Sequence, residues 1–192
     1  MEAKELQEAR TNPEFLDYLD VREKELMESK SISGLYELLD SLLVLNINEE
    51  RVHNVYQEIL KVSFDTIEER LKDEKKLSLD DDDIFFIRSF YEHAIEKWSM
   101  SNFKGAKELF FILTQICEDE LLIEALNVHL IACAKESEMD IFYEEYVSLE
   151  QTYTEDKYGY FILDFTFETK KYLNTNIKLL QKQFEELSHL MH

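Results

Sequence analysis

The sequence predicts an all-α protein built from antiparallel helical hairpins, and three observations lead to this fold class. First, the 192 residues contain only three glycines and one proline, against roughly 13 and 10 at average usage. Few positions can therefore adopt a positive φ at low cost, and almost nothing interrupts a helix. Second, apolar residues recur at helical spacing along most of the chain. Third, the composition is 45% hydrophobic and 12% aromatic, which is sufficient for a substantial core.

The first helices are signalled by a cap and by apolar spacing. Asn12, Pro13 and Glu14 predict a helix start, because Asn caps, Pro fits the first turn and Glu favours the positive end of the helix dipole. The dense apolar run at 35–45 predicts a buried helix. From 52 to 71, apolar residues keep helical spacing and predict another.

A charged stretch divides the chain. Residues 72–76, Lys-Asp-Glu-Lys-Lys, have no apolar residue and predict a linker. We therefore expect an N-terminal helical region at 1–76 and a second region of helical hairpins at 77–192, with the two either separate or packed as one domain.

Four successive aspartates, Asp80–Asp83, precede an apolar run. Carboxylates at that place fit a helix N-terminus, where the dipole stabilises each by about 0.3–1 kcal/mol. A calcium-binding EF-hand loop that begins at Asp80 would need Gly at its sixth position and Glu at its twelfth. The chain has Phe85 and Tyr91 there, so the helix start is the prediction.

Paired helices joined by short polar turns are expected beyond this point, and short turns between helices make antiparallel hairpins. The expected helices are 84–98, 103–116, 121–134 and 139–149. The stretch 161–167, Phe-Ile-Leu-Asp-Phe-Thr-Phe, is rich in strand-forming residues, but a single strand would have no partner, so we predict helix there. An amphipathic helix at 177–191 closes the chain.

Residues 84–150 resemble the tetratricopeptide repeat. After the turn that follows Trp98 come Phe103, then Ala106 three residues on, then Phe110, which is the spacing of aromatic, small and aromatic residues that this family uses to pack two helices closely. A second copy would place Phe142 and Tyr146 at the last two of these positions. The chain has His93-Ala94 and His129-Leu130 where the family carries Leu-Gly. Within the family, the chain is most similar to the small acidic chaperones of bacterial type III secretion.

The resemblance implies a short tetratricopeptide-like solenoid, with an irregular bundle as the other arrangement, and a protein-binding function. First helices of such repeats line a groove that accepts a partner peptide. The positions that correspond to groove residues are Arg88, Tyr91, Ile95, Trp98, Asn127, Ile131 and Ala134. The same helical spacing is also typical of buried helix faces, so core packing is the alternative for each.

The charge narrows the class of partner. Net charge is −21, which disfavours nucleic acid and anionic membrane surfaces as partners. The stretch from 118 to 168 contains 14 acidic residues and only two basic ones, Lys135 and Lys157. A basic protein is therefore a second kind of partner, for which the chain would act as an acidic charge mimic and inhibitor. Long apolar stripes would also suit a homodimer.

The charged N-terminus and the separate cysteines, Cys117 and Cys133, lead us to expect a cytoplasmic protein with buried free thiols.

An enzymatic function has one candidate. The motifs Glu50-x-x-His53 and Glu186-x-x-His189 have the i, i+3 spacing that a helical di-iron site uses. Matches of this kind are common in a chain so rich in Glu, and no other catalytic motif occurs. The sequence therefore predicts a non-enzymatic adaptor or chaperone without a cofactor, with the metal-carboxylate enzyme as the alternative.

Overall fold

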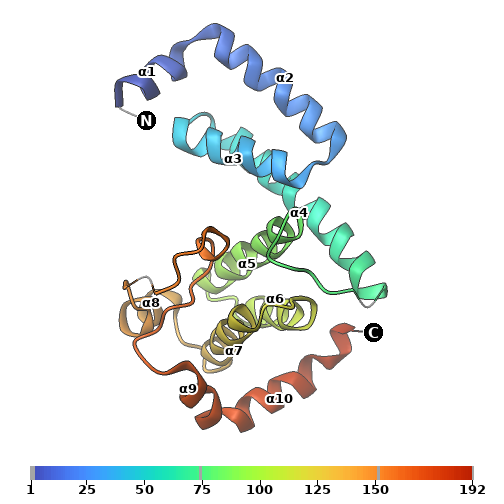
Figure 1. Ribbon diagram of the computed structural model, residues 1–192, viewed down its shortest axis with the longest axis vertical. Helices are drawn as coiled ribbons and strands as arrows, with labels where there is room; N and C mark the ends of the chain where they lie inside the picture. The colour runs from blue at the N-terminus through green and yellow to red at the C-terminus, as the bar shows by residue number, and fades with distance from the viewer. Residues whose placement is uncertain (1–2, 74, 151, 192) are drawn as a thin grey trace. The chain divides into compact units, whose positions relative to one another are not determined.

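The computed structural model describes residues 3–73, 75–150 and 152–191, with side chains from residue 7 onward. Helices dominate these residues, and the all-α prediction is confirmed (Figure 1). The α-helices are α1 (Ala3–Thr11), α2 (Pro13–Ser29), α3 (Ile32–Leu45), α4 (Glu49–Lys72), α5 (Asp83–Ser99), α6 (Phe103–Ile116), α7 (Glu120–Ala134), α8 (Met139–Tyr146), α9 (Thr169–Thr175) and α10 (Ile177–Leu187). Two short 3₁₀ turns are η1 (Asp156–Tyr158) and η2 (Ser188–Met191).

The chain divides into two compact units, Met1–Ile67 and Glu68–His192, which we call unit 1 and unit 2. The division falls within α4, upstream of the linker expected at 72–76. Helix α4 ends at Lys72, where that linker is expected to begin.

Unit 1 holds α1 to α3 and most of α4. The predicted cap is confirmed, because Asn12 Oδ1 accepts hydrogen bonds from the backbone N–H groups of Glu14 (3.0 Å) and Phe15 (3.4 Å). Gly34 allows α2 and α3 to approach closely, since a Cβ added there would overlap the Leu26 side chain. Burial of apolar surface is the main stabilising term in a core of this kind. The core of unit 1 consists of Tyr36 and aliphatic side chains, among them Leu19, Leu26, Leu35, Leu42, Val55 and Ile59.

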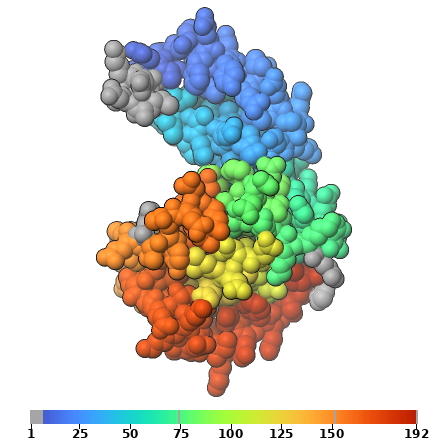
Figure 2. Space-filling model, viewed as in Figure 1, coloured from blue at the N-terminus to red at the C-terminus, as the bar shows by residue number. Residues whose placement is uncertain are grey.

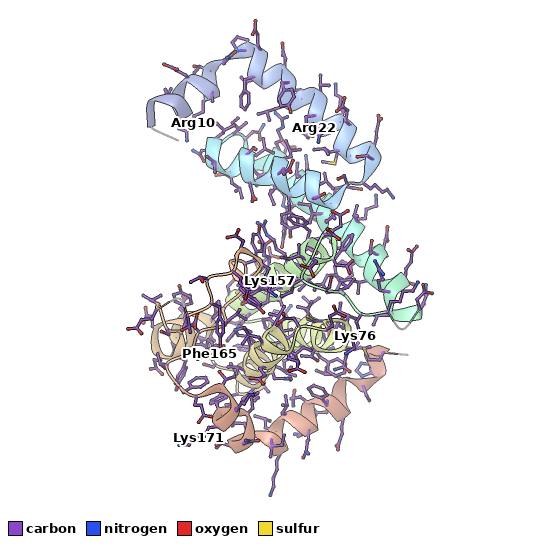
Figure 3. The ribbon with its side chains drawn as sticks, viewed as in Figure 1. Arg10, Arg22, Lys76, Lys157, Phe165 and Lys171 are labelled. Atoms are coloured by element: carbon purple, nitrogen blue, oxygen red, sulfur yellow. The ribbon has the colours of Figure 1, made fainter. Side chains whose placement is uncertain are left out.

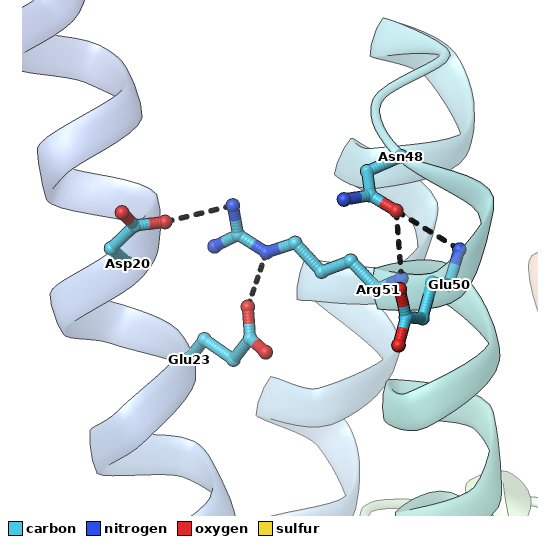
Figure 4. A network of polar contacts seen from close by, with 5 residues as sticks. All are labelled: Asp20, Glu23, Asn48, Glu50 and Arg51. Carbon is cyan, nitrogen blue, oxygen red and sulfur yellow. Dashed lines mark hydrogen bonds and ion pairs between the residues drawn. The ribbon is translucent and has the colours of Figure 1, made fainter.

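An ion-pair network ties α4 to α2 in unit 1 (Figure 4). Arg51 Nη1 lies 2.8 Å from Asp20 Oδ1, and Arg51 Nε donates a hydrogen bond to Glu23 Oε2. Asn48 Oδ1 accepts from the backbone N–H groups of Glu50 (3.0 Å) and Arg51 (3.4 Å) and so caps α4 at the same place.

Unit 2 is built on three consecutive helices, α5, α6 and α7, which pack against one another, with α10 against α6 and α7. The core is aromatic at its centre and contains Phe90, Trp98 and Phe110. Asp83 lies in the first turn of α5, so the acidic run does precede a helix, and its carboxylate contacts Arg70 at 3.2 Å.

The structure corrects the helix expected at 161–167. Residues 147–150 and 152–168, which we call the covering segment, contain only the η1 turn. Strand-like residues here do find a partner, because Val147 and Phe165 form an isolated antiparallel bridge. The Ser148 N–H donates to the Asp164 carbonyl and the Thr166 N–H to the Tyr146 carbonyl, both at 2.9 Å. Helix α8 accordingly ends at Tyr146, three residues before the expected 149.

Candidate protein-binding surface

Tyr91 and Trp98, at the centre of the predicted groove, lie inside unit 2 and are 3% and 0% exposed. The Tyr91 hydroxyl accepts a hydrogen bond from the Ile162 N–H at 2.9 Å, and its ring centroid lies 5.1 Å from that of Phe161. Trp98 Nε1–H donates to the Ser137 carbonyl at 2.7 Å. The chain's own covering segment therefore occupies the position in front of Tyr91 that the resemblance assigns to a partner peptide.

The remaining groove positions are buried or half-buried. Arg88 donates from Nε to Glu92 Oε1 at 2.7 Å, and its guanidinium carbon lies 4.3 Å from the centroid of the Tyr160 ring. Ile131 is buried, whereas Ile95, Asn127 and Ala134 are half-buried. Asn127 Oδ1 is buried without a hydrogen-bond partner among the described residues. Together the seven positions line helix faces that are mostly closed by neighbouring elements.

His129 lies at the centre of an aromatic cage in unit 2. Its ring is stacked 5.2 Å from Phe110, and the rings of Tyr91, Trp98 and Phe165 each lie 5.8 Å away. Both ring nitrogens are buried without a hydrogen-bond partner among the described residues. Burial lowers the pKa of His129 to about 3, because a charged imidazolium would lose its hydration there. His129 is therefore a neutral core residue.

Both cysteines are free and buried, as the sequence predicted. Burial raises the pKa of Cys117 to about 11 and raises that of Cys133 further above its ordinary range. Since the thiolate is the reactive form, neither sulfur is prepared for nucleophilic chemistry near neutral pH.

Large exposed side chains gather on α8 and the covering segment, which Figure 2 shows in orange on the surface of unit 2. The aromatic and aliphatic members are Ile141, Tyr143, Tyr146, Leu149, Tyr153 and Tyr160. Exposed carboxylates alternate with them, namely Asp140, Glu144, Glu145, Glu150, Glu155 and Asp156. We call these twelve residues the tyrosine–carboxylate surface. The sequence revealed the acidic half of this surface but not its exposed tyrosines, since Tyr146 was expected at a packing position of the repeat and no pattern marked Tyr153 or Tyr160.

The covering segment is anchored beneath this surface. Phe165, labelled in Figure 3, lies 5.8 Å from the His129 ring and 6.2 Å from the Phe142 ring by centroid. Phe161 and Leu163 are buried. Phe161, Leu163 and Phe165, at alternate positions of the segment, thus face the core, while Tyr153 and Tyr160, which precede them, are exposed.

A pocket of about 570 Å³ opens within the covering segment. Its lining residues are Tyr153, Thr154, Glu155, Asp156, Tyr158, Gly159, Tyr160, Phe161, Leu163 and Asp164. The Tyr153 and Tyr158 rings meet edge to face, with centroids 6.0 Å apart. Tyr158 donates from its hydroxyl to Asp119 Oδ2 at 3.1 Å, which fixes its ring.

The two Glu-x-x-His motifs lie in different units, Glu50 and His53 in unit 1 and Glu186 and His189 in unit 2. Both histidines are exposed, and His189 Nδ1 lies 2.9 Å from the backbone carbonyl of Glu186. Within the described part of the chain, no three His, Cys, Asp or Glu side chains come together in a group that could hold a metal ion.

No protein-family model matches the chain, and neither a curated protein nor a solved structure matches it significantly. Among the described residues, no helix combines the length and the apolar character needed to cross a bilayer.

Proposed function

We propose that the protein is a non-enzymatic protein-binding module, of the adaptor or chaperone kind, which contacts its partner through the tyrosine–carboxylate surface. The observation that carries the proposal is the concentration of exposed Tyr, Leu and Ile side chains between residues 141 and 160. Exposed apolar side chains that gather in one place mark interaction sites more often than isolated ones do.

The residue types of this surface support the proposal. Tyrosine is enriched among residues that contribute most to protein–protein binding, because its ring is large and rigid and its hydroxyl forms hydrogen bonds. Leu149 is 79% exposed, and an aliphatic side chain so far from the core gains most by burial against a second protein. The neighbouring carboxylates make the rim predominantly negative, with Lys157 beside Glu155 as the basic residue within 140–160.

The carboxylates of this surface favour a basic partner, and they are the residues through which a charge mimic would bind. Glu144 and Glu145 are both exposed on α8 beside Tyr143 and Tyr146. Carboxylates at the rim of an interface raise the rate of association with a basic surface and make it sensitive to salt. The charge-mimic function and the adaptor function thus share one surface and differ in how far binding depends on ionic strength.

Site-specific photo-crosslinking tests the proposal in native cytosol. A benzophenone amino acid is placed at Tyr143 or Tyr153 and, as a control, at Tyr18, which is exposed in unit 1. We expect the same partner protein to be captured from positions 143 and 153 and to be missing from position 18. The absence of a covalent adduct at 143 and 153, or identical adducts at all three positions, would overturn the proposal.

A further inference from the structure

We infer that the pocket in the covering segment receives the guanidinium group of an arginine from a basic segment of the partner. This inference rests on the proposed function and names the chemistry by which that partner is recognised. It follows from the pocket's aromatic rings, from its carboxylates and from cation contacts that the same rings already make.

Aromatic rings and carboxylates occur together in the pocket lining. Tyr153, Tyr158 and Tyr160 contribute rings, and Glu155, Asp156 and Asp164 contribute negative charge. Neither Lys nor Arg is present among the described lining residues, although Lys157 Nζ lies 3.5 Å from Glu155 Oε2. A planar guanidinium can stack on a tyrosine ring while its N–H groups bind a carboxylate in a bidentate manner.

The tyrosines of the covering segment already contact cations of this chain. The Arg88 guanidinium carbon lies 4.3 Å from the centroid of the Tyr160 ring, and Lys157 Nζ lies 4.8 Å from that of Tyr158. Both distances are within the range of about 6 Å at which a cation is attracted to a ring face. Two tyrosine rings of the segment therefore already bind cations within the molecule. The ring of Tyr153, with 39% of the residue exposed, has no cation contact among the described residues.

The pocket is held in shape by contacts to the body of unit 2. Ile162 donates its N–H to Tyr91, and the buried side chains of Phe161 and Leu163 fix the segment on either side of it. Asp164 Oδ2 accepts from the Thr152 N–H at 3.1 Å, which orients that carboxylate. Such pre-organisation lowers the entropic cost of binding.

Charge and size decide among classes of ligand. Between residues 118 and 168 there are 14 acidic and two basic residues, so an anionic ligand would be repelled. An apolar ligand would desolvate the carboxylates without compensation. The pocket volume of about 570 Å³ lies within the range of roughly 300–1,000 Å³ that is typical of ligand pockets. An arginine side chain and its adjoining backbone would therefore fit.

Three synthetic peptides of one sequence test the inference, with arginine, lysine or citrulline at the central position. Each peptide is titrated into the full-length, ¹⁵N-labelled protein at low ionic strength, and amide chemical shifts are followed. We expect the arginine peptide to shift resonances of residues 152–164, the lysine peptide to bind more weakly, and the citrulline peptide, which lacks the charge, to bind at least ten-fold more weakly.

Matched variants separate a specific site from general attraction by the net charge. Tyr153→Leu should lower the affinity for the arginine peptide by about five-fold, the loss expected for one exposed cation–π contact. Glu155→Gln should lower this affinity by a similar factor. Tyr18→Leu and Glu28→Gln make the same changes at exposed positions of unit 1 and should leave binding unchanged.

Equal weakening by Glu155→Gln and Glu28→Gln, or equal binding of arginine and citrulline peptides, would overturn the inference. Shifts located outside the covering segment would do so as well. If photo-crosslinking captures a partner at Tyr153 while no arginine peptide binds, the proposed function stands and the assignment of arginine fails. The reverse result would retain the cation site and reject the protein partner.

Discussion

The side chain of Tyr91 accepts a hydrogen bond from the backbone amide of Ile162, 71 residues further along the chain, at 2.9 Å. Tyr91 lies on α5, at the position where a groove residue was expected, and Ile162 lies in the covering segment. One bond therefore joins the predicted groove to the segment that fills it. This bond is one of the attachments of the covering segment, which carries Leu149, Tyr153 and Tyr160 of the tyrosine–carboxylate surface.

Replacing Tyr91 by Phe should loosen the covering segment. The substitution keeps the ring in the core but leaves the partly buried Ile162 N–H without its acceptor, and the loss of such a bond costs about 1 kcal/mol. We expect faster hydrogen exchange at the Ile162 amide and a lower free energy of unfolding in urea. Tyr18→Phe removes the same hydroxyl group at an exposed position and is the control. Unchanged exchange at Ile162 in Tyr91→Phe would show that the bond does not hold the segment.

His129 should make unit 2 less stable in acid. In the folded protein its pKa is lowered by burial to about 3, whereas the unperturbed value is 6.5. Between these values the unfolded state binds the proton and the folded state does not, so stability falls as pH drops from 6.5 toward 3. The slope reaches about 1.4 kcal/mol per pH unit for one such group.

A His129→Phe variant tests this slope, because phenylalanine keeps an apolar ring among the surrounding aromatic residues without a titrating group. The measurement is the free energy of unfolding in urea at several pH values, taken as the difference between variant and wild type. That difference should move in favour of the variant as pH falls, and the contributions of the carboxylates common to both proteins cancel. Parallel pH profiles would contradict the assignment of a buried neutral histidine.

Local sequence signals predicted those parts of the fold whose causes lie within a few residues. Asn12 caps its own helix, and the charged stretch after Lys72 carries no apolar residue to continue one. The covering segment was mispredicted because the bridge from Phe165 to Val147 joins residues distant in sequence. A helical spacing that contains Tyr91 and Trp98 is the same whether that face lines an open groove or a filled one, so spacing alone could not distinguish them.

The Arg51 network should stabilise unit 1 more than an exposed pair of similar geometry does. The Arg51 side chain is only 17% exposed and contacts two carboxylates, whereas in the Lys72–Glu68 pair both side chains are 68% exposed. We expect Arg51→Met to lower the free energy of unfolding by about 1 kcal/mol and Lys72→Met to lower it far less. Urea denaturation at low and high salt measures both, and equal effects of the two variants would show that the partial burial of Arg51 adds nothing.

Salt dependence should distinguish the charge-mimic function from binding by the aromatic side chains alone. Glu144→Gln combined with Glu145→Gln removes two exposed charges from α8 and should slow association with the captured partner by roughly ten-fold at low salt, with a smaller effect above about 0.5 M salt. Glu37→Gln with Asp40→Asn makes the same charge change on α3 of unit 1 and serves as the control. If Tyr143→Ser abolishes binding while the glutamine pair leaves the association rate unaltered, the tyrosines supply the affinity and the charge mimic is rejected. Equal slowing by both pairs would instead assign the attraction to the net charge of −21 and to no particular surface.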